Sequence, residues 1–289
     1  MAWVESIQKA IDYMEKNLME NLTIDSIAKQ ANVSAFHFQR TFSVLTDITV
    51  GDYIRRRRLT LAGEELLTTD TKVIDIAHKY GYETPEAFSK AFRRQHNLTP
   101  SDLRKSKGKL QSYNRLMIQV TLKGANPMKY SVIEKNAFQI VGIKREFSSV
   151  AEEENVIGIP ELWEEVNHNG TCDQLFQLND GVVKGVLGVC GEVSKEQKDV
   201  NVFDYWVATS YAGEVPNGML SLELPASKWA VFEVHGPMPT AMQNAWKQIF
   251  SEWFPSTGYQ HAGTPEFELY SDEDPNSPDL YSEIWIPIK

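Results

Sequence analysis

Cysteine is scarce in this chain of 289 residues, which holds only Cys172 and Cys190. Two cysteines so far apart, without ligand residues beside them, exclude a disulfide framework and a cysteine-based metal site, and are typical of a reducing compartment. The sequence also lacks an apolar run long enough to span a membrane. Its first residues contain no basic segment followed by an apolar one, so we expect no signal peptide and a cytoplasmic location.

Positive charge is also low overall, since 29 Lys and Arg face 39 Asp and Glu and give a formal net charge of −10. Such a balance alone argues against nucleic-acid binding. The charge is unevenly distributed, however, because residues 1–110 hold 17 basic and 14 acidic side chains, whereas residues 111–289 hold 12 and 25. This asymmetry indicates either that the first part contacts phosphate or that two ordinary domains differ in charge.

A pattern of two short helices around a tight turn occurs twice in the first part of the chain, after an amphipathic helix predicted over residues 3–18. The matching positions are Ile27, Ala28, Phe38 and Phe42 in the first copy, and Ile76, Ala77, Phe88 and Phe92 in the second. Residues suited to ending or starting a helix stand at the turns: Asn32 and Ser34, then Gly81 and Thr84. Helix, turn, helix is the unit whose second helix enters the major groove of DNA.

The segment 52–67 lies between the two copies and has a continuous helical pattern. Sixteen helical residues span roughly 24 Å. With the flanking units, this length brings the two reading helices near the ~34 Å repeat of DNA. One chain is then able to read two successive segments of the major groove.

The first candidate reading helix presents Ala35, Phe36, Gln39 and Arg40 opposite its core positions. Glutamine pairs with adenine and arginine with guanine, while an apolar ring contacts a thymine methyl group. These four residues are therefore candidate DNA contacts. The alternative is an ordinary solvated helix face.

The second candidate reading helix offers Thr84, Pro85, Glu86, Lys90 and Arg94. Lys90 and Arg94 suit phosphate better than base edges, whereas Glu86 accepts from a cytosine amino group or merely favours the helix start.

The run of four arginines that begins at Arg55 points in all directions on a helix. Only part of it, including Arg55, is expected to meet DNA, and the rest to form pairs within the protein.

These residues, together with Gly51-Asp52-Tyr53-Ile54-Arg55 and Thr99-Pro100-Ser101, resemble the AraC/XylS family of bacterial transcription regulators over residues 3–107. The resemblance implies an all-α domain of seven helices with two helix-turn-helix units. It also implies activation of transcription through contacts with promoter DNA and RNA polymerase. By position, Phe36, Gln39 and Arg40 match the base-contacting surface of the family, and Pro85, Glu86 and Lys90 stand at the corresponding places of the second unit.

The remainder predicts a multidomain chain, with an all-α domain over residues 1–110, a linker over 111–127 with a short strand at 116–122, and an α+β domain over 128–289. Strands are expected at 140–145, 183–189, 203–209, 229–235, 266–270 and 281–288, and helices at 160–167 and 239–254. The order strand, helix, strand, strand occurs twice. Two similar βαββ modules would place a cleft at their junction.

The last strand places Tyr281, Glu283 and Trp285 on one face. Burying a carboxylate without a partner costs several kcal/mol. A cationic ligand is one possible partner, with aromatic rings adding cation–π attraction. The alternative is that the aromatic residues form core and that Glu283 pairs with a basic side chain or lies at an exposed edge. The further aromatic candidates for a ligand pocket are Trp163, Tyr205, Trp206, Phe232 and Tyr270.

This half resembles the GyrI-like small-molecule-binding domain through Val231-Phe232-Glu233-Val234-His235-Gly236-Pro237, Phe267-Glu268-Leu269-Tyr270 and the terminal Glu283-Ile284-Trp285-Ile286-Pro287-Ile288. The resemblance implies two pseudo-symmetric βαββ modules around a pocket, with Glu283 as its carboxylate. Combined with the first resemblance, it implies the Rob-type arrangement, in which the DNA-binding domain precedes the sensing domain, as in regulators of multidrug response.

The sequence therefore predicts a transcription regulator whose partners are double-stranded promoter DNA, RNA polymerase and a small, cationic and lipophilic effector. We expect no enzyme activity, no cofactor, no metal, no membrane contact, and a monomer or weak dimer. Three alternatives remain open: a constitutive regulator without a sensing function, a small-molecule hydrolase with Glu283 as base, and an architectural DNA binder with a steep salt dependence.

Overall fold

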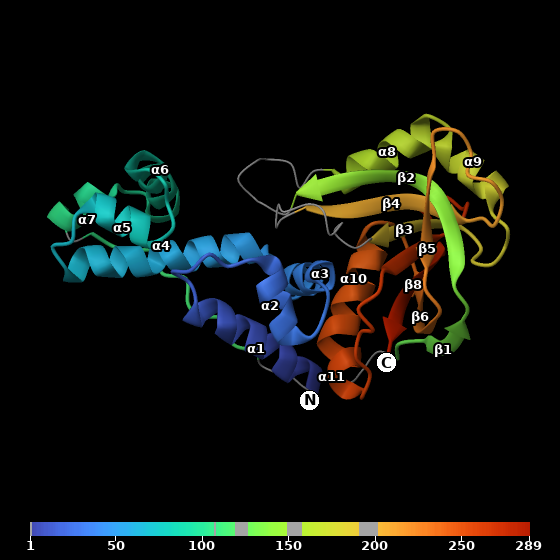
Figure 1. Cartoon of the computed structure of the whole chain (residues 1–289), viewed down its shortest axis with the longest axis horizontal. Coiled ribbons are helices and arrows are strands. Elements are labelled where there is room, and N and C mark those ends of the chain that lie inside the picture. The colour runs from blue at the N-terminus through green and yellow to red at the C-terminus, as the bar shows by residue number, and fades with distance from the viewer. Residues whose placement is uncertain (1, 107, 119–126, 149–157, 191–201) are drawn as a thin grey trace.

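The computed structural model describes residues 2–106, 108–118, 127–148, 158–190 and 202–289 (Figure 1). Residues up to 106 form helices, and the residues from 130 onward form an antiparallel sheet with helices packed on it. This arrangement confirms the predicted fold class. Among the described residues, no helix has both the length and the hydropathy needed to cross a bilayer.

The first helix-turn-helix unit consists of α2 (Ile24–Ala31) and α3 (Ala35–Thr46), with α1 (Ala2–Lys16) packed on α2. Local signals set its boundaries as predicted. Thr23 accepts a hydrogen bond from the backbone N–H of Ser26, and Ser34 accepts one from that of His37 at 3.2 Å. Asn32 ends α2 in the left-handed conformation with φ 57°, which asparagine tolerates better than most residues.

The long helix α4 (Val50–Thr68) leads to the second unit, formed by α5 (Val73–Lys79) and α6 (Pro85–His96) and closed by α7 (Pro100–Ser106). Thr84 caps α6 by accepting from the backbone N–H of Ala87, and Pro85 occupies its first turn. The unit has its own core, which includes the buried rings of Phe88 and Phe92. Figure 1 shows this unit at the far end of α4, away from the sheet.

The sheet has the strand order β1-β6-β8-β7-β3-β4-β2-β5, and every neighbouring pair is antiparallel. The strands are β1 (Tyr130–Lys135), β2 (Phe138–Ser148), β3 (Val186–Cys190), β4 (Val202–Ser210), β5 (Leu220–Leu224), β6 (Ser227–His235), β7 (Glu266–Tyr270) and β8 (Tyr281–Ile288). From each edge inward, the sheet has one edge strand, β1 or β5, and then the first, third and second strands of one module. These are β6, β8 and β7 in one half, and β2, β4 and β3 in the other. The two modules therefore join at β7 and β3, as a pseudo-symmetric pair.

Helices of both modules pack on one face of this sheet. The first module contributes α8 (Ile159–His168) and α9 (Thr171–Leu178), and the second contributes α10 (Thr240–Gln248), a π-helical turn η1 (Ile249–Trp253) and α11 (Phe254–Ser256). The sequence did not predict β1, β5 or α9. Both strands lie at the sheet edges and are half exposed, so they lack the apolar runs that marked the inner strands.

The first helix-turn-helix unit shares one hydrophobic core with the sheet domain. Buried residues of α1–α4 and of α10, η1, α11, β6 and β8 form a single cluster. Figure 1 shows α3 beside α10, and residues of these two helices are in contact. The first unit is thus built into the C-terminal half, whereas the second unit is not.

The described part of the expected linker packs along the helical domain. Leu116 donates its backbone N–H to the Tyr53 hydroxyl at 3.1 Å, and Ile118 donates to the Gln8 side chain at 2.9 Å. Residues 116–118 form no strand, and the rest of the strand expected at 116–122 lies outside the described residues. The domain boundaries at 110 and 128 stay predictions.

Candidate functional site

The registers of β7 and its neighbours decide which side chains share a face of the sheet. Glu268 stands opposite Gly188 of β3 and Ile284 of β8, so Glu266, Glu268 and Tyr270 lie on the face that the helices cover. Glu283 stands opposite Leu269 and therefore lies on the other face. The centre of the helix-covered face, where the two modules meet, thus carries two acidic side chains.

Glu268 is a buried carboxylate with three donors around it. Trp246 of α10 donates its indole N–H to Oε1 at 2.6 Å, and Tyr270 donates its hydroxyl to Oε2 at 2.7 Å. The third donor is the Arg40 guanidinium, which comes from α3 of the first helix-turn-helix unit and forms an ion pair with Oε1. With the residue only 7% exposed, this cation supplies the charge that burial of the carboxylate demands.

The Arg40 side chain extends from α3 of the helical domain into the sheet domain. Its guanidinium carbon lies 3.8 Å from the centroid of the Trp246 ring, one N–H points to Cys190 Sγ at 3.3 Å, and Nε lies 3.9 Å from Glu266. Burial is the largest single influence and opposes its charge, but the combined attraction of Glu268, Cys190 and Glu266 outweighs burial and raises the pKa of Arg40 above its ordinary value. Burial likewise raises the pKa of the Cys190 thiol, so Cys190 accepts this contact as a neutral group.

An aromatic wall continues from Glu268 into the first module. Trp163 of α8 packs edge-on against Tyr270, with ring centroids 4.8 Å apart, and donates its N–H to the Tyr205 hydroxyl at 3.0 Å. Gly188 makes room for this pair, because a Cβ there would lie 2.3 Å from the Tyr205 oxygen. Burial, followed by the nearby charge of Glu268, raises the pKa of both tyrosines well above 10, so both remain neutral; Tyr270 donates to Glu268, and Tyr205 accepts from Trp163.

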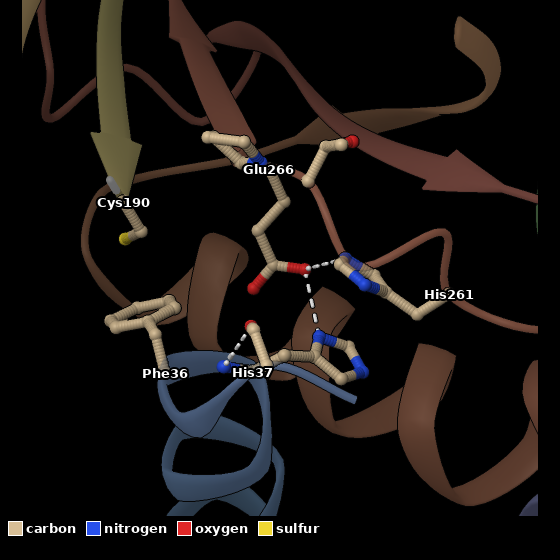
Figure 2. A pocket seen from close by; sticks show the side chains of 8 residues that line it. Phe36, His37, Cys190, His261 and Glu266 are labelled. Atoms are coloured by element: carbon tan, nitrogen blue, oxygen red, sulfur yellow. Dashed lines mark hydrogen bonds and ion pairs between the residues drawn. The ribbon is translucent and has the colours of Figure 1, made fainter. Parts of the chain in front are cut away.

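A cluster of Glu266 and two histidines lies beside Arg40, and Figure 2 shows Glu266 between His37 and His261. Glu266 Oε2 lies 3.1 Å from Nδ1 of His37, on α3, and 3.3 Å from Nε2 of His261. The backbone N–H of Gly263 donates to His261 Nδ1, which assigns the ring proton of the neutral imidazole to Nε2, the atom that faces Glu266. Burial opposes the charge of Glu266, but the two histidines outweigh it and lower its pKa; burial and His37 lower the pKa of His261 to about 4.

These three side chains are also the one group in the described part of the chain whose donor atoms could hold a metal ion, since the atoms lie within 4.8 Å of one another. The cavity beside them measures about 10 Å³, room for about one water molecule. His37 and His261 both direct a ring nitrogen at Glu266 Oε2, while His261 Nε2 and Glu266 Oε1 are buried without a hydrogen-bond partner among the described residues.

The predicted ligand residues divide between the two faces. Tyr270, Tyr205 and Trp163 come together beside Glu268, while Phe232 lies farther along the same face and packs against Trp253. Trp206 belongs to the apolar cluster on the opposite face.

Glu283 does not lie among the predicted pocket residues. It accepts hydrogen bonds from Trp285 and Tyr281 on its own strand and stands on the face opposite Tyr270. Two residues of the observed site, Glu268 and Trp246, were not predicted to bind a ligand. A signal for Glu268 was present, since its motif Glu268-Leu269-Tyr270 has the same carboxylate-to-aromatic spacing as Glu283-Ile284-Trp285. Only the register shows which face each one occupies.

The predicted DNA contacts of the first reading helix face the sheet domain. Arg40 binds Glu268, and Phe36 packs with the cluster that contains Cys190 and Tyr205. Ala35 packs against the shared core, and Gln39 is half-buried. All twelve residues of α3 are described, and none of them is exposed. A role of these residues in DNA binding stays a prediction and requires α3 to leave this position.

The second reading helix is open. Five of the twelve residues of α6 are exposed: Glu86, Ala87, Lys90, Arg93 and Arg94. Ser89, Lys90, Arg93, Arg94 and Thr99 line a shallow groove along it. Thr84 is exposed as well, and Pro85 is half-buried. The predicted phosphate contacts are thus free to meet DNA.

The arginine run forms contacts within the chain at every position. Arg55 pairs with Asp52 at 2.5 Å, and the guanidinium of Arg56 lies over the Tyr113 ring. Arg57 forms a two-pronged contact with Glu15 at 2.8 and 2.9 Å. Arg58 donates to the carbonyl oxygens of Leu18 and Glu20.

Two family models match the chain. Residues 131–288 match the family described as "Integron-associated effector binding protein", and residues 27–106 match the family described as "Helix-turn-helix domain". The two matches correspond to the sheet domain and to both helix-turn-helix units.

Among similar proteins, the regulatory protein SoxS of Escherichia coli K12 is 43% identical over 104 residues, which are 36% of this chain and 97% of SoxS. The transcriptional activator AarP of Providencia stuartii is 37% identical over 112 residues, 39% of this chain and 81% of AarP. A crystal structure described as a putative transcription regulation protein from Staphylococcus aureus covers 56% of this chain and 99% of its own, with 26% identity and a TM-score of 0.48. The curated relatives are regulators, which confirms the prediction that the chain is not an enzyme.

Proposed function

Because the chain belongs to the family of integron-associated effector binding proteins and joins such a domain to an AraC-type DNA-binding domain, we propose that it is a one-component regulator that binds an organic cation at Glu268. The observation that carries this proposal is that Glu268 already holds a cation. The carboxylate pairs with the Arg40 guanidinium and the indole face of Trp246 stacks on it, as they would with a free cationic group, while the Tyr270 hydroxyl donates to the same carboxylate.

The site also favours a cation that is partly apolar. Trp163, Tyr205 and Tyr270 continue from Glu268 as a buried aromatic wall without a further charge of their own, since both tyrosines stay neutral. A lipophilic cation gains both charge pairing and apolar burial at such a wall. We assign the ligand carboxylate to Glu268 in place of Glu283.

On the DNA side, α3 and α6 are the two reading helices of one chain, joined by the 19 residues of α4. This arrangement supports the reading of two successive major-groove segments by a monomer. A cytoplasmic location is a further part of the proposal. AarP is an activator by its printed name, and we extend activation through contact with RNA polymerase to this chain as part of the proposal.

Selection from a pool of randomised duplex DNA tests the DNA-binding part. The wild-type protein is expected to enrich an asymmetric motif of about two helical turns, because DNA captures the fraction of molecules in which α3 is free. The Lys90→Ala variant is expected to enrich the same motif with lower affinity, since Lys90 is assigned to phosphate. Failure to enrich any motif would sink the proposal of a sequence-specific regulator.

Titration with tetraphenylphosphonium, an aromatic cation without hydrogen-bond donors, tests the effector part through the fluorescence of Trp246 and its neighbours. Binding by the wild type is expected to be lost in Glu268→Gln and kept in Glu283→Gln. The two variants are matched, because each glutamate accepts hydrogen bonds from one tryptophan and one tyrosine. Equal loss in both variants would contradict the assignment to Glu268.

A further inference from the structure

The contacts of Arg40 are those expected of a ligand. Its guanidinium pairs with a buried carboxylate that lies 228 residues later in the chain, and it stacks 3.8 Å from an indole centroid. The side chain keeps only 16% of its surface exposed. Stacking and charge pairing together are how protein sites recognise planar cations.

A second cation has no place in the site while Arg40 is there. Glu268 Oε1 receives both Trp246 and Arg40, and Oε2 receives Tyr270. The Trp246 ring directs its N–H edge at Glu268, and the guanidinium covers one of its faces. A free cation that uses the same carboxylate and the same ring must therefore displace Arg40.

Displacement of Arg40 acts directly on the DNA-reading surface, because Arg40 lies on the outer face of α3. The same face is attached to the sheet domain by His37 at Glu266 and by Phe36. We propose that Arg40 is a built-in occupant of the cation site, and that an effector cation releases the first recognition helix by replacing it. This proposal rests on the function proposed above and adds its regulation.

Arg40 and a free cation exclude each other from Glu268, and this exclusion couples cation binding to the release of α3. A ligand shifts an equilibrium only by the difference in its affinity for the two states. Here the closed state offers the cation no site, so all of its binding energy favours the open state. The apparent affinity for the cation is lowered by the fraction of molecules that are closed. Removal of Arg40 should therefore strengthen binding of a free cation.

The first test compares hydrogen exchange of the backbone amides in Glu268→Gln, Glu283→Gln and the wild type. Glu268→Gln is expected to speed exchange in α3 by about tenfold or more, because local opening becomes easier, while α6 exchanges as before. Glu283→Gln is expected to leave both helices unchanged, since Glu283 lies on the other face of the sheet. Unchanged exchange of α3 in Glu268→Gln, or equal acceleration in both variants, would overturn the proposal.

The second test uses ethylguanidinium, which reproduces the end of the arginine side chain, and isothermal titration of the full chain. The Arg40→Ala variant is expected to bind it at least about tenfold more tightly than the wild type, because the competing group is gone. The double variant with Glu268→Gln should lose this binding. Equal affinity of Arg40→Ala and wild type would overturn the proposal even if Glu268→Gln did not fold.

The two proposals fail in distinguishable ways. In one outcome, DNA selection yields a motif while ethylguanidinium binds Arg40→Ala and the wild type equally. That result supports the proposed regulator and contradicts the proposal that Arg40 occupies the cation site. If ethylguanidinium binds Arg40→Ala as expected but no DNA motif emerges, the occupancy of the cation site stands and the DNA-binding function falls.

Discussion

The two recognition helices have equal length and equivalent core residues, but only α6 presents its outer face to solvent. Phe38 and Phe42 of α3 and Phe88 and Phe92 of α6 are all buried. The outer face of α3 is covered by α10 and by the acidic centre of the sheet, whereas that of α6 lines an open groove with basic side chains. The comparison teaches that the outer face of one unit is exposed in this structure, whereas that of the other is packed against the effector-binding domain.

The largest expected effects are on the free energy of unfolding and concern the buried phenylalanines at equivalent positions of the two helices. Phe38→Ala and Phe88→Ala should each lower the free energy of unfolding by about 3–5 kcal/mol, because each removes a fully buried ring. Urea unfolding monitored by circular dichroism checks the size. If one variant were much less destabilised than the other, the two units would not be equivalent in their cores.

A contrast of intermediate size lies within the arginine run on α4. Arg57→Ala should cost about 2 kcal/mol, because it removes both charged hydrogen bonds to the nearly buried Glu15. Arg55→Ala should cost less than about 1 kcal/mol, since its pair with Asp52 is more exposed. Thermal unfolding compares the two variants. Equal destabilisation would contradict a structural role specific to Arg57.

Acidification should loosen α3 and leave α6 protected. The pKa of His261 is lowered from 6.5 to about 4 by burial and by His37, so its contribution is complete above pH 6.5 and is lost as the pH falls toward 4. The lowered pKa of Glu266 acts in the same direction below pH 4.5. Other groups packed around this cluster are Arg40, Cys190 and Lys289.

Hydrogen-exchange protection factors at pH 7 and pH 5 measure this effect. We expect protection of α3 to fall while that of α6 is unchanged. Equal protection of α3 at both pH values would show that the histidine cluster does not hold this helix.

The smallest expected effects concern single phosphate contacts of the open helix. Lys90→Ala and Arg94→Ala should each weaken binding to all DNA sequences alike and reduce the slope of log K against log salt by about 1. In a Glu268→Gln background, Arg40→Ala should instead relax the preference among DNA sequences, because the Arg40 side chain is assigned to a base. A change of preference in Lys90→Ala would reverse these roles.

The helices and the inner strands of this fold follow from local signals in the sequence. Ser34 and Thr84 cap the helices that they were expected to cap, and Asn32 and Gly81 adopt positive φ at the two turns. β7 and β8 begin and end at the predicted residues. Each of these features depends on residues a few positions apart.

The site depends on contacts between distant segments, which local patterns do not contain. The outer face of α3 has the same side chains whether it contacts DNA or another domain, so the sequence indicates a base contact for Arg40, which stays a prediction, and does not indicate the ion pair with Glu268. Glu283 and Glu268 have the same aromatic spacing, and the register of β7 and β8 separates them. A sequence pattern specifies which residues alternate along a strand, but it does not specify which face is covered.

The affinity of Glu268→Gln for the DNA duplex selected by the wild type tests the link between the two domains most directly. Titration of labelled duplex at fixed salt, with wild type and Glu283→Gln alongside, measures it. The account predicts that Glu268→Gln binds about tenfold more tightly than both, because α3 no longer has to be withdrawn from its carboxylate partner. Affinity equal to or below that of the wild type, in a variant that unfolds at the same urea concentration, would contradict the account.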